Sequence, residues 1–179
     1  MATGTILLWP GEVTLPDGTT NNAWARAQVF KSTGTPPTNG PNLFAAELLF
    51  GGGANDEHAF FGFGMPQDYS SGGTLYINWK RASGTGAANV VWKGAVAAVT
   101  PGGTEVPNSK ALNTVATTTT AAGTTVQALQ QTTITLTMDS AAARDSVWVM
   151  LGRDSSNASD TLDAVDAQVA SVWLEYTTT

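Results

Sequence analysis

The sequence predicts an all-β protein, an antiparallel β-sandwich of about eight to ten strands in one domain spanning residues 1–179. Threonine (27 residues) and glycine (19 residues) are abundant, which favours strands and turns over helices. Short apolar stretches recur about every ten residues, separated by turn-forming residues. No long apolar pattern has the period of a helix. A chain of 179 residues is long enough to bury the core of one such domain.

Nine candidate strands follow in order along the chain, each bounded by Gly, Pro, Asn, Asp or Ser. They cover residues 5–9, 23–31, 43–50, 58–65, 74–82, 89–99, 125–138, 146–153 and 167–176. Residues 1–22 are a possible N-terminal arm. Residues 100–124 are too long for a hairpin loop and have no core-building period, so we expect a long irregular crossover or an arm lying on another surface.

Alternation assigns faces to strands 58–65 and 74–82, which together hold five aromatic residues. In strand 58–65, Phe61 shares the core face with Phe63 and Met65, whereas Phe60 lies on the opposite face with His58. In strand 74–82, three apolar side chains alternate with polar ones and with Tyr76, which predicts one wet face. The two apolar rows should face each other across the core.

Two other strands have apolar residues on both faces. Strand 146–153 carries Trp148 and Met150 opposite its valine row, and strand 167–176 sets Trp173 opposite Val172 and Leu174. A second apolar face must be covered by a loop, an arm or another subunit, and the low charge content (12%) favours a subunit. The candidate interface residues are Phe60, Tyr76, Trp148, Met150 and Trp173.

Composition excludes several functional classes. The net charge of −6 argues against nucleic-acid binding, which requires a clustered basic face. Without cysteine there is no disulfide, no thiolate nucleophile and no cysteine-built zinc site. The N-terminus has no basic region and only a short apolar run, and no apolar stretch reaches the roughly 18 residues of a membrane span, so we expect a soluble protein made in a cytoplasm.

Catalysis is not expected. His58 is the only histidine, cannot form a multi-histidine metal site and accompanies no nucleophile motif, so it is interpreted as a surface or capping residue beside an acidic turn. A hydrolase on a sandwich scaffold would require two convergent carboxylates. The glutamates Glu47, Glu57, Glu105 and Glu175 lie far apart in the sequence, and nothing marks two of them as a pair.

The acidic segment 152–168 has two possible interpretations. Its aspartates could bind calcium, but they lack the register of an EF-hand loop. We favour a structural role, in which Asp160 and Thr161 form a cap or turn and Arg153 pairs with a loop carboxylate. The residues expected in this pairing are Arg153, Asp154 and Asp160, and no metal or cofactor is expected.

Three stretches together resemble a group of tailed-phage and marine-metagenome virion proteins. These are "LLWP" at 7–10, "HAFFGFGMPQDYSSGGTLYINWK" at 58–80 followed by "NVVWKGAV" at 89–96, and "LGRDSSNASDTLDAVDAQVASVWLEY" at 151–176. The resemblance implies a jelly-roll fold and a virion structural part. The leading hypothesis is a non-enzymatic capsid decoration (cement) protein, a homotrimer that binds the major capsid protein or a neighbouring virion protein on the capsid surface and stabilises the head.

An alternative keeps the same fold with a different partner. In this hypothesis the chain is a receptor- or carbohydrate-binding module of a phage tail fibre or tail tip. Aromatic rings outside the core would be its contact residues, because such rings stack on sugars. The candidates are Trp9, Trp24, Tyr69 and Tyr76.

Overall fold

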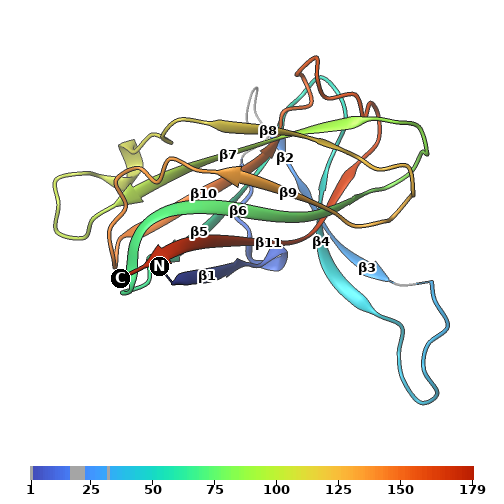
Figure 1. Cartoon of the computed structure of the whole chain (residues 1–179), viewed down its shortest axis with the longest axis horizontal. Coiled ribbons are helices and arrows are strands. Elements are labelled where there is room, and N and C mark those ends of the chain that lie inside the picture. Colours follow the sequence, from blue (N-terminus) through green and yellow to red (C-terminus); the bar gives the residue numbers. More distant parts are fainter. Residues whose placement is uncertain (1, 17–22, 32) are drawn as a thin grey trace.

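Two β-sheets packed face to face make up the computed structural model, which describes residues 2–16, 23–31 and 33–179 (Figure 1). The strands are β1 (Thr3–Leu8), β2 (Ala23–Trp24), β3 (Arg26–Lys31), β4 (Phe44–Phe50), β5 (Glu57–Gly64), β6 (Tyr69–Arg81), β7 (Asn89–Val99), β8 (Ala116–Ala121), β9 (Gln130–Thr135), β10 (Ser146–Arg153) and β11 (Ala167–Thr178). Two short 3₁₀ turns, η1 (Pro10–Glu12) and η2 (Pro107–Ser109), interrupt the loops.

The strand order confirms the predicted sandwich of jelly-roll type. Sheet A has the order β3-β4-β11-β6-β9, with β1 also paired to β11, and sheet B has the order β2-β5-β10-β7-β8. The eight strands from β4 to β11 therefore form two opposed four-stranded sheets, β4-β11-β6-β9 and β5-β10-β7-β8, which is the jelly-roll arrangement. The pairs are antiparallel except for the short parallel contact of β2 with β5. The N-terminal strands β1, β2 and β3 are additions to this frame.

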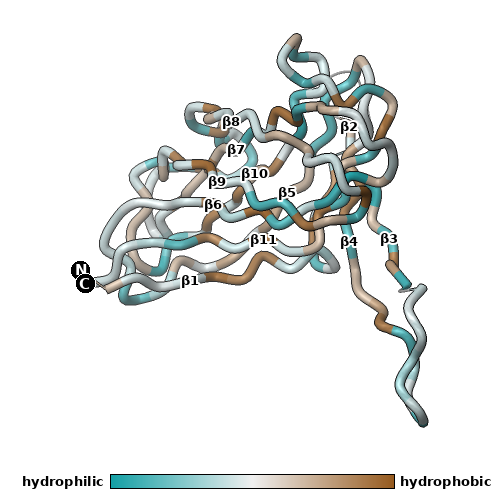
Figure 2. The backbone as a smooth tube through the Cα atoms, turned by 45° about the vertical axis from the view of Figure 1, so that its right-hand side comes forward, coloured by the Kyte–Doolittle hydropathy of each residue, from teal (hydrophilic) through white to brown (hydrophobic). Residues whose placement is uncertain are grey.

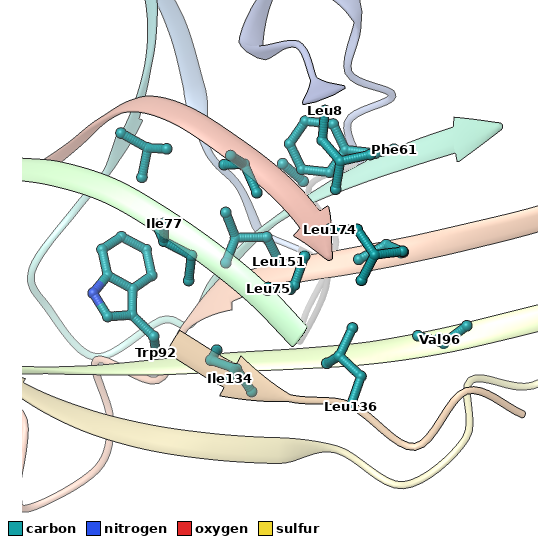
Figure 3. Packing of buried hydrophobic residues seen from close by; sticks show 14 of the residues in the cluster. Leu8, Phe61, Leu75, Ile77, Trp92, Val96, Ile134, Leu136, Leu151 and Leu174 are labelled. Atoms are coloured by element: carbon teal, nitrogen blue, oxygen red, sulfur yellow. The ribbon is translucent and has the colours of Figure 1, made fainter. Parts of the chain in front are cut away.

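The core lies between the sheets and contains the apolar rows expected from alternation. Phe61 of β5 is in sheet B, whereas Leu75 and Ile77 of β6 are in sheet A, so the two rows meet across the sandwich (Figure 3). Trp79 and Trp92 are fully buried and pack edge to face with ring centroids 5.5 Å apart. The indole N–H of Trp79 donates to a threonine hydroxyl of β9, which satisfies its one polar group.

The region expected to be an irregular crossover, residues 100–124, contains strand β8. Its sequence, ATTTTA, has strand propensity but no apolar alternation, so its pairing with β7 left no signal in the sequence. The hydroxyl of Thr132 in β9 donates to that of Thr120 in β8 at 2.8 Å, and this contact closes one side of the sandwich. The irregular parts of this region are residues 100–115 and 122–124, on either side of β8.

The N-terminal segment, expected as a possible arm over residues 1–22, contains a strand of sheet A. Strand β1 pairs with the C-terminal half of β11, and β4 pairs with the N-terminal half of the same edge. Thr14 exchanges two backbone hydrogen bonds with Phe60 at the edge of β5. The rest of the expected arm, residue 1 and residues 17–22, lies outside the described residues.

A bulge at Ala170 changes which side chains of β11 face the core. Before it, Val169 is fully buried; after it, Val172 is fully buried, so the spacing of inward residues is three rather than two. Trp173 consequently lies on the outer face of sheet A. An uninterrupted strand would have turned Trp173 into the core.

The hairpin of β3 and β4 projects beyond the sandwich (Figure 1). Hydrophobic stretches continue along both of its strands away from the body (Figure 2). Val29, Leu43 and Phe44 are 71%, 65% and 54% exposed. The hairpin therefore carries apolar surface that the core of this chain does not cover.

A buried ion pair joins the end of β10 to the loop that follows it. Arg153 and Asp160 are both almost fully inaccessible, and the guanidinium donates to the two carboxylate oxygens at 2.7 and 2.9 Å. The expected pairing of Arg153 with a loop carboxylate therefore involves Asp160. Asp154 instead accepts a hydrogen bond from the side chain of Asn157.

The same two side chains satisfy backbone groups of several elements. Arg153 also donates to the carbonyls of Phe50, Leu162 and Val165, and Asp160 accepts from the backbone N–H of Val91. Paired charges with these additional hydrogen bonds can be kept out of water, whereas either charge alone could not.

Replacing Asp160 should therefore be far more damaging than replacing an exposed aspartate of the same loop. Asp160→Asn leaves the Arg153 charge buried without its counterion, and we expect the free energy of unfolding to fall by about 3–5 kcal/mol. Asp163→Asn, at an exposed position, should change it by less than about 0.5 kcal/mol. Urea unfolding of both variants measures the difference, and equal stabilities would contradict the assigned role.

Candidate functional site

The five candidate interface residues divide between the two outer faces of the sandwich. Tyr76 and Trp173 lie on sheet A, on neighbouring strands β6 and β11. Phe60, Trp148 and Met150 lie on sheet B, on neighbouring strands β5 and β10. The two groups are separated by the core, so they form two distinct surfaces.

On sheet A the two aromatic rings form a stacked pair. Trp173 is directly opposite Tyr76 in the strand register, and the rings are parallel within 3° with centroids 5.3 Å apart. At this separation parallel rings are offset, so each keeps part of its face outside the pair. Leu7 of β1 and Thr133 of β9 continue the line on either side, and Leu7 is 59% exposed. We call these four residues, Leu7, Trp173, Tyr76 and Thr133, the aromatic row.

Polar side chains border the aromatic row on one side. Asn78 donates to the hydroxyl of Ser171 at 3.1 Å, and Gln131 donates to the side-chain oxygen of Asn78 at 3.1 Å. These three residues are aligned across β11, β6 and β9. They place amide and hydroxyl groups one step along the strands from the rings.

A carboxylate and several hydroxyls border the other side. Glu175, between Thr5 and Thr74 in the register, accepts a hydrogen bond from the Tyr76 hydroxyl at 3.2 Å. The negative charge of Glu175 and this hydrogen bond raise the pKa of Tyr76, so the phenol stays protonated. A shallow hollow of about 110 Å³ adjoins Glu175. The row is therefore an apolar strip between two polar borders.

Charge at the far end of this face is neutralised internally. The ammonium of Lys80 is 2.6 Å from a carboxylate oxygen of Glu47, and both side chains are buried. The ring of Phe30 covers Lys80, with the ammonium 3.7 Å from the ring centroid. This pair therefore contributes little field to the aromatic row.

On sheet B the second apolar face of β10 is partly covered by the chain itself. Met150 is 4% exposed. Pro107, Lys110 and Leu112 of segment 100–115 lie beside Phe60, Ala97 and Trp148 on this face. Phe60 and Trp148 remain half-buried. The segment expected to lie on another surface thus lies on its own sheet. Part of the apolar face that was expected to contact another subunit is therefore bordered by a segment of the same chain.

Other candidate sugar-contacting rings are in different positions. Tyr69 is 7% exposed and packs against Tyr176 with centroids 5.7 Å apart, so its ring cannot contact a ligand. Trp9 and Trp24 are 51% and 44% exposed. Trp9 precedes η1 and lies two residues after Leu7, whereas Trp24 belongs to β2 of sheet B. Leu7, Asn78, Gln131 and Glu175 complete the row and its borders, and only the strand register identifies them.

His58 lies at the start of β5, where its Nδ1 is 3.4 Å from the carbonyl of Ala23. Burial lowers the pKa of His58, and the charge of Lys93 lowers it further. Burial by itself would raise the pKa of Asp56, but hydrogen bonds from Lys93 and Ser156 outweigh it and lower that pKa to about 2. Lys93 is bound to Asp56, with its ammonium 2.5 Å from a carboxylate oxygen.

Each of the four glutamates considered as possible catalytic acids has a partner of another kind. Glu47 binds Lys80, Glu57 accepts from the backbone of Gly51, Glu105 binds Lys110, and Glu175 binds Tyr76. Within residues 2–16, 23–31 and 33–179, no three acidic or histidine side chains are grouped so that they could hold a metal ion. Among these same residues, no helix is long and apolar enough to cross a membrane.

No protein-family model matches the sequence, and neither does any curated protein. Several solved structures share its overall form at low identity. One belongs to a study of the promiscuous specificity of carbohydrate-binding modules from the β-sandwich superfamily (14% identity, TM-score 0.37, 96% of this chain and 56% of that one). Another contains the CBM22-1 and GH10 modules of the xylanase Xyn10B from Clostridium thermocellum with xylohexaose (14% identity, TM-score 0.44, 94% of this chain and 28% of that one). A third is the family 11 carbohydrate-binding module from Clostridium thermocellum with a mixed-linked tetrasaccharide (10% identity, TM-score 0.44, 97% of this chain and 96% of that one).

The chain thus spans about half the length of the first of these proteins and about a quarter of the second. A likeness at this level concerns the arrangement of strands, and no residue correspondence follows from it.

The environment of His58 predicts a measurable acid dependence. Since its folded pKa lies below the ordinary value of 6.5, the folded state binds the proton less readily than the unfolded state. The neutral imidazole of His58 therefore contributes to the free energy of unfolding in full above pH 6.5. This contribution should be lost as the pH falls through the folded pKa. NMR titration of the single imidazole should give a pKa below 6.5, and His58→Gln should flatten the slope of stability against pH in this range. A titration midpoint at or above 6.5 would contradict the assignment.

Proposed function

We propose that this protein is a non-catalytic carbohydrate-binding module whose site is the aromatic row of sheet A. The observation that carries the proposal is the partly exposed Tyr76–Trp173 stack between two borders of hydrogen-bonding side chains. A sugar ring has apolar C–H faces and a rim of hydroxyls. The aromatic row offers apolar contact to the faces, and the borders offer donors and acceptors to the rim.

The charge of the surface selects among glycans. Glu175 is a carboxylate beside the rings, and Lys80 is neutralised by Glu47. The chain as a whole has a net charge of −6. Anionic glycans would be repelled by both the local and the overall charge, so the favoured ligands are neutral.

The shape of the surface favours a chain of sugars over a single residue. The aromatic row crosses four neighbouring strands, β1, β11, β6 and β9, which span about 14 Å at the usual spacing between strands. It is a sheet face rather than a deep cavity. A short linear oligosaccharide lying across the strands would contact both rings and both polar borders.

Trp173→Ala should weaken oligosaccharide binding at least about tenfold, because it removes one ring of the stack. Calorimetric titration with a panel of neutral linear tetrasaccharides and hexasaccharides measures the effect. Trp148→Ala, which removes a half-buried tryptophan from the opposite sheet, is the matched control and should leave the affinity unchanged. Absence of binding across the panel, or equal losses in the two variants, would overturn the proposal.

Tyr76→Phe separates the ring from its hydroxyl. The variant keeps the stack on Trp173 but loses the hydrogen bond to Glu175, so we expect a smaller loss of affinity, about two- to fivefold. A loss as large as that of Trp173→Ala would show that the hydroxyl, rather than the apolar ring face, dominates binding.

A second candidate function, a homotrimeric capsid decoration protein of a virion, is favoured by one observation. The projecting β3–β4 hairpin exposes Val29, Leu43 and Phe44, whereas isolated domains rarely hold such residues away from their core (Figure 1). In this candidate the hairpin contacts a neighbouring copy or the major capsid protein.

This candidate is tested by the oligomeric state. Light scattering should show a trimer that the double variant Val29→Thr, Phe44→Ser weakens at least about tenfold. Val106→Thr, at a similarly exposed site in another loop, is the control and should leave the trimer intact. A monomeric wild-type protein that also fails to bind capsids would exclude the decoration role.

A further inference from the structure

The crossover between β7 and β8 forms a hollow on the outer face of sheet B. Segment 100–115 leaves the end of β7, forms η2 and returns toward β8 (Figure 1). Between this segment and the sheet lies a half-open cavity of about 240 Å³, here called the crossover hollow. Its lining residues are Phe60, Ala97, Pro107, Lys110, Leu112 and Trp148.

The lining is apolar except at one point. Phe60, Ala97 and Trp148 come from the three adjacent strands β5, β7 and β10 and form the floor. Pro107 and Leu112 of the crossover form the wall, and Lys110 is the single charged lining residue. A hollow with one polar group cannot satisfy the many hydroxyls of a sugar, so its chemistry differs from that of the aromatic row.

Asp139 holds the crossover in place over the sheet. One of its oxygens accepts from the backbone N–H of Ala98 at 2.8 Å, and the other accepts from the side chain of Asn113 at 2.9 Å. The backbone N–H of Asn113 also donates to Val96 at 2.8 Å. The wall is therefore tied to the strand that forms its floor, and the hollow is formed before any ligand arrives.

The charges around Lys110 determine which ligands suit the hollow. Its ammonium is 2.6 Å from Glu105 and 3.0 Å from Asp139, so two of its three protons have carboxylate partners. The third can donate to a ligand. Because two carboxylates surround one ammonium, the local net charge is negative and disfavours anionic ligands.

We propose that the crossover hollow binds a neutral aromatic compound of one or two rings that carries a hydrogen-bond acceptor, and that this acceptor accepts a hydrogen bond from the ammonium of Lys110. The ring would pack against Trp148 and Phe60. A cavity of about 150 Å³ accommodates benzene, so about 240 Å³ suits a substituted or fused ring. This site is on the opposite sheet from the aromatic row and does not depend on the carbohydrate proposal.

Acetophenone, a neutral ring with one carbonyl, is a suitable probe. Two-dimensional NMR spectra of the whole chain should show saturable shifts at the amides of Ala97 and Leu112, with a dissociation constant on the order of 1 mM. Ethylbenzene, which lacks the acceptor, should bind at least about threefold more weakly, and benzoate should also bind more weakly than acetophenone. No saturable shift up to about 10 mM, or shifts confined to other regions, would overturn the proposal.

Ala97→Leu places a larger side chain on the floor of the hollow and should weaken acetophenone binding at least about tenfold. Ala87→Leu makes the same change at an exposed position lining a different hollow and should leave binding unchanged. Thermal unfolding verifies that both variants fold. Acetophenone binding by Ala97→Leu equal to that of the wild type would refute the site.

Lys110→Met tests the acceptor separately from the cavity. It should remove the preference for acetophenone over ethylbenzene while both still bind, and a retained preference would refute the role of Lys110. Trp173→Ala, which should abolish oligosaccharide binding, should leave acetophenone binding unchanged. A failure of the carbohydrate proposal and a failure of this one are thereby distinguished.

Discussion

The buried pair of Arg153 and Asp160 is the interaction on which the rest of the structure depends. Two charges in the interior are tolerated because they pair through two hydrogen bonds. Backbone carbonyls accept the other hydrogen bonds of Arg153, and a backbone N–H donates to Asp160. The pair sits where the chain passes from β10 in sheet B to β11 in sheet A. It therefore sets the position at which β11 enters, and β11 pairs with β1, β4 and β6.

The two outer faces differ because the crossover between β7 and β8 lies against part of sheet B but not against sheet A. Around the aromatic row the outer face of sheet A is partly exposed, and it combines two rings with amides, hydroxyls and one carboxylate. On sheet B the crossover is tied to β7 through Asp139, and an apolar hollow lies between it and Trp148. An open polar–aromatic face and a covered apolar hollow suit different ligand chemistries, which is why the two proposals concern separate sites.

Much of the fold could be predicted from alternation, and much of the candidate site could not. The inward rows around Phe61 and Ile77 were predictable because each strand has one clearly apolar face. Strand β8 could not be predicted in this way, because its threonines favour an extended backbone but show no alternation of apolar and polar residues. Tyr76 and Trp173 stood out as apolar residues on the wrong face, but their stacking depends on the register of two strands nearly 100 residues apart in the chain. Asn78 and Gln131 have no local signal at all.

The sequence by itself determined the sandwich, its core rows, the low charge and the presence of apolar residues beyond the core, because periodicity and composition are local properties of a chain. Only the tertiary structure decided what those extra residues meet. A single bulge at Ala170 turned Trp173 outward, strand register brought it onto Tyr76, and the crossover placed Pro107 and Leu112 beside Trp148. These outcomes depend on pairing between distant segments, and one residue of register exchanges the inner and outer faces of a strand.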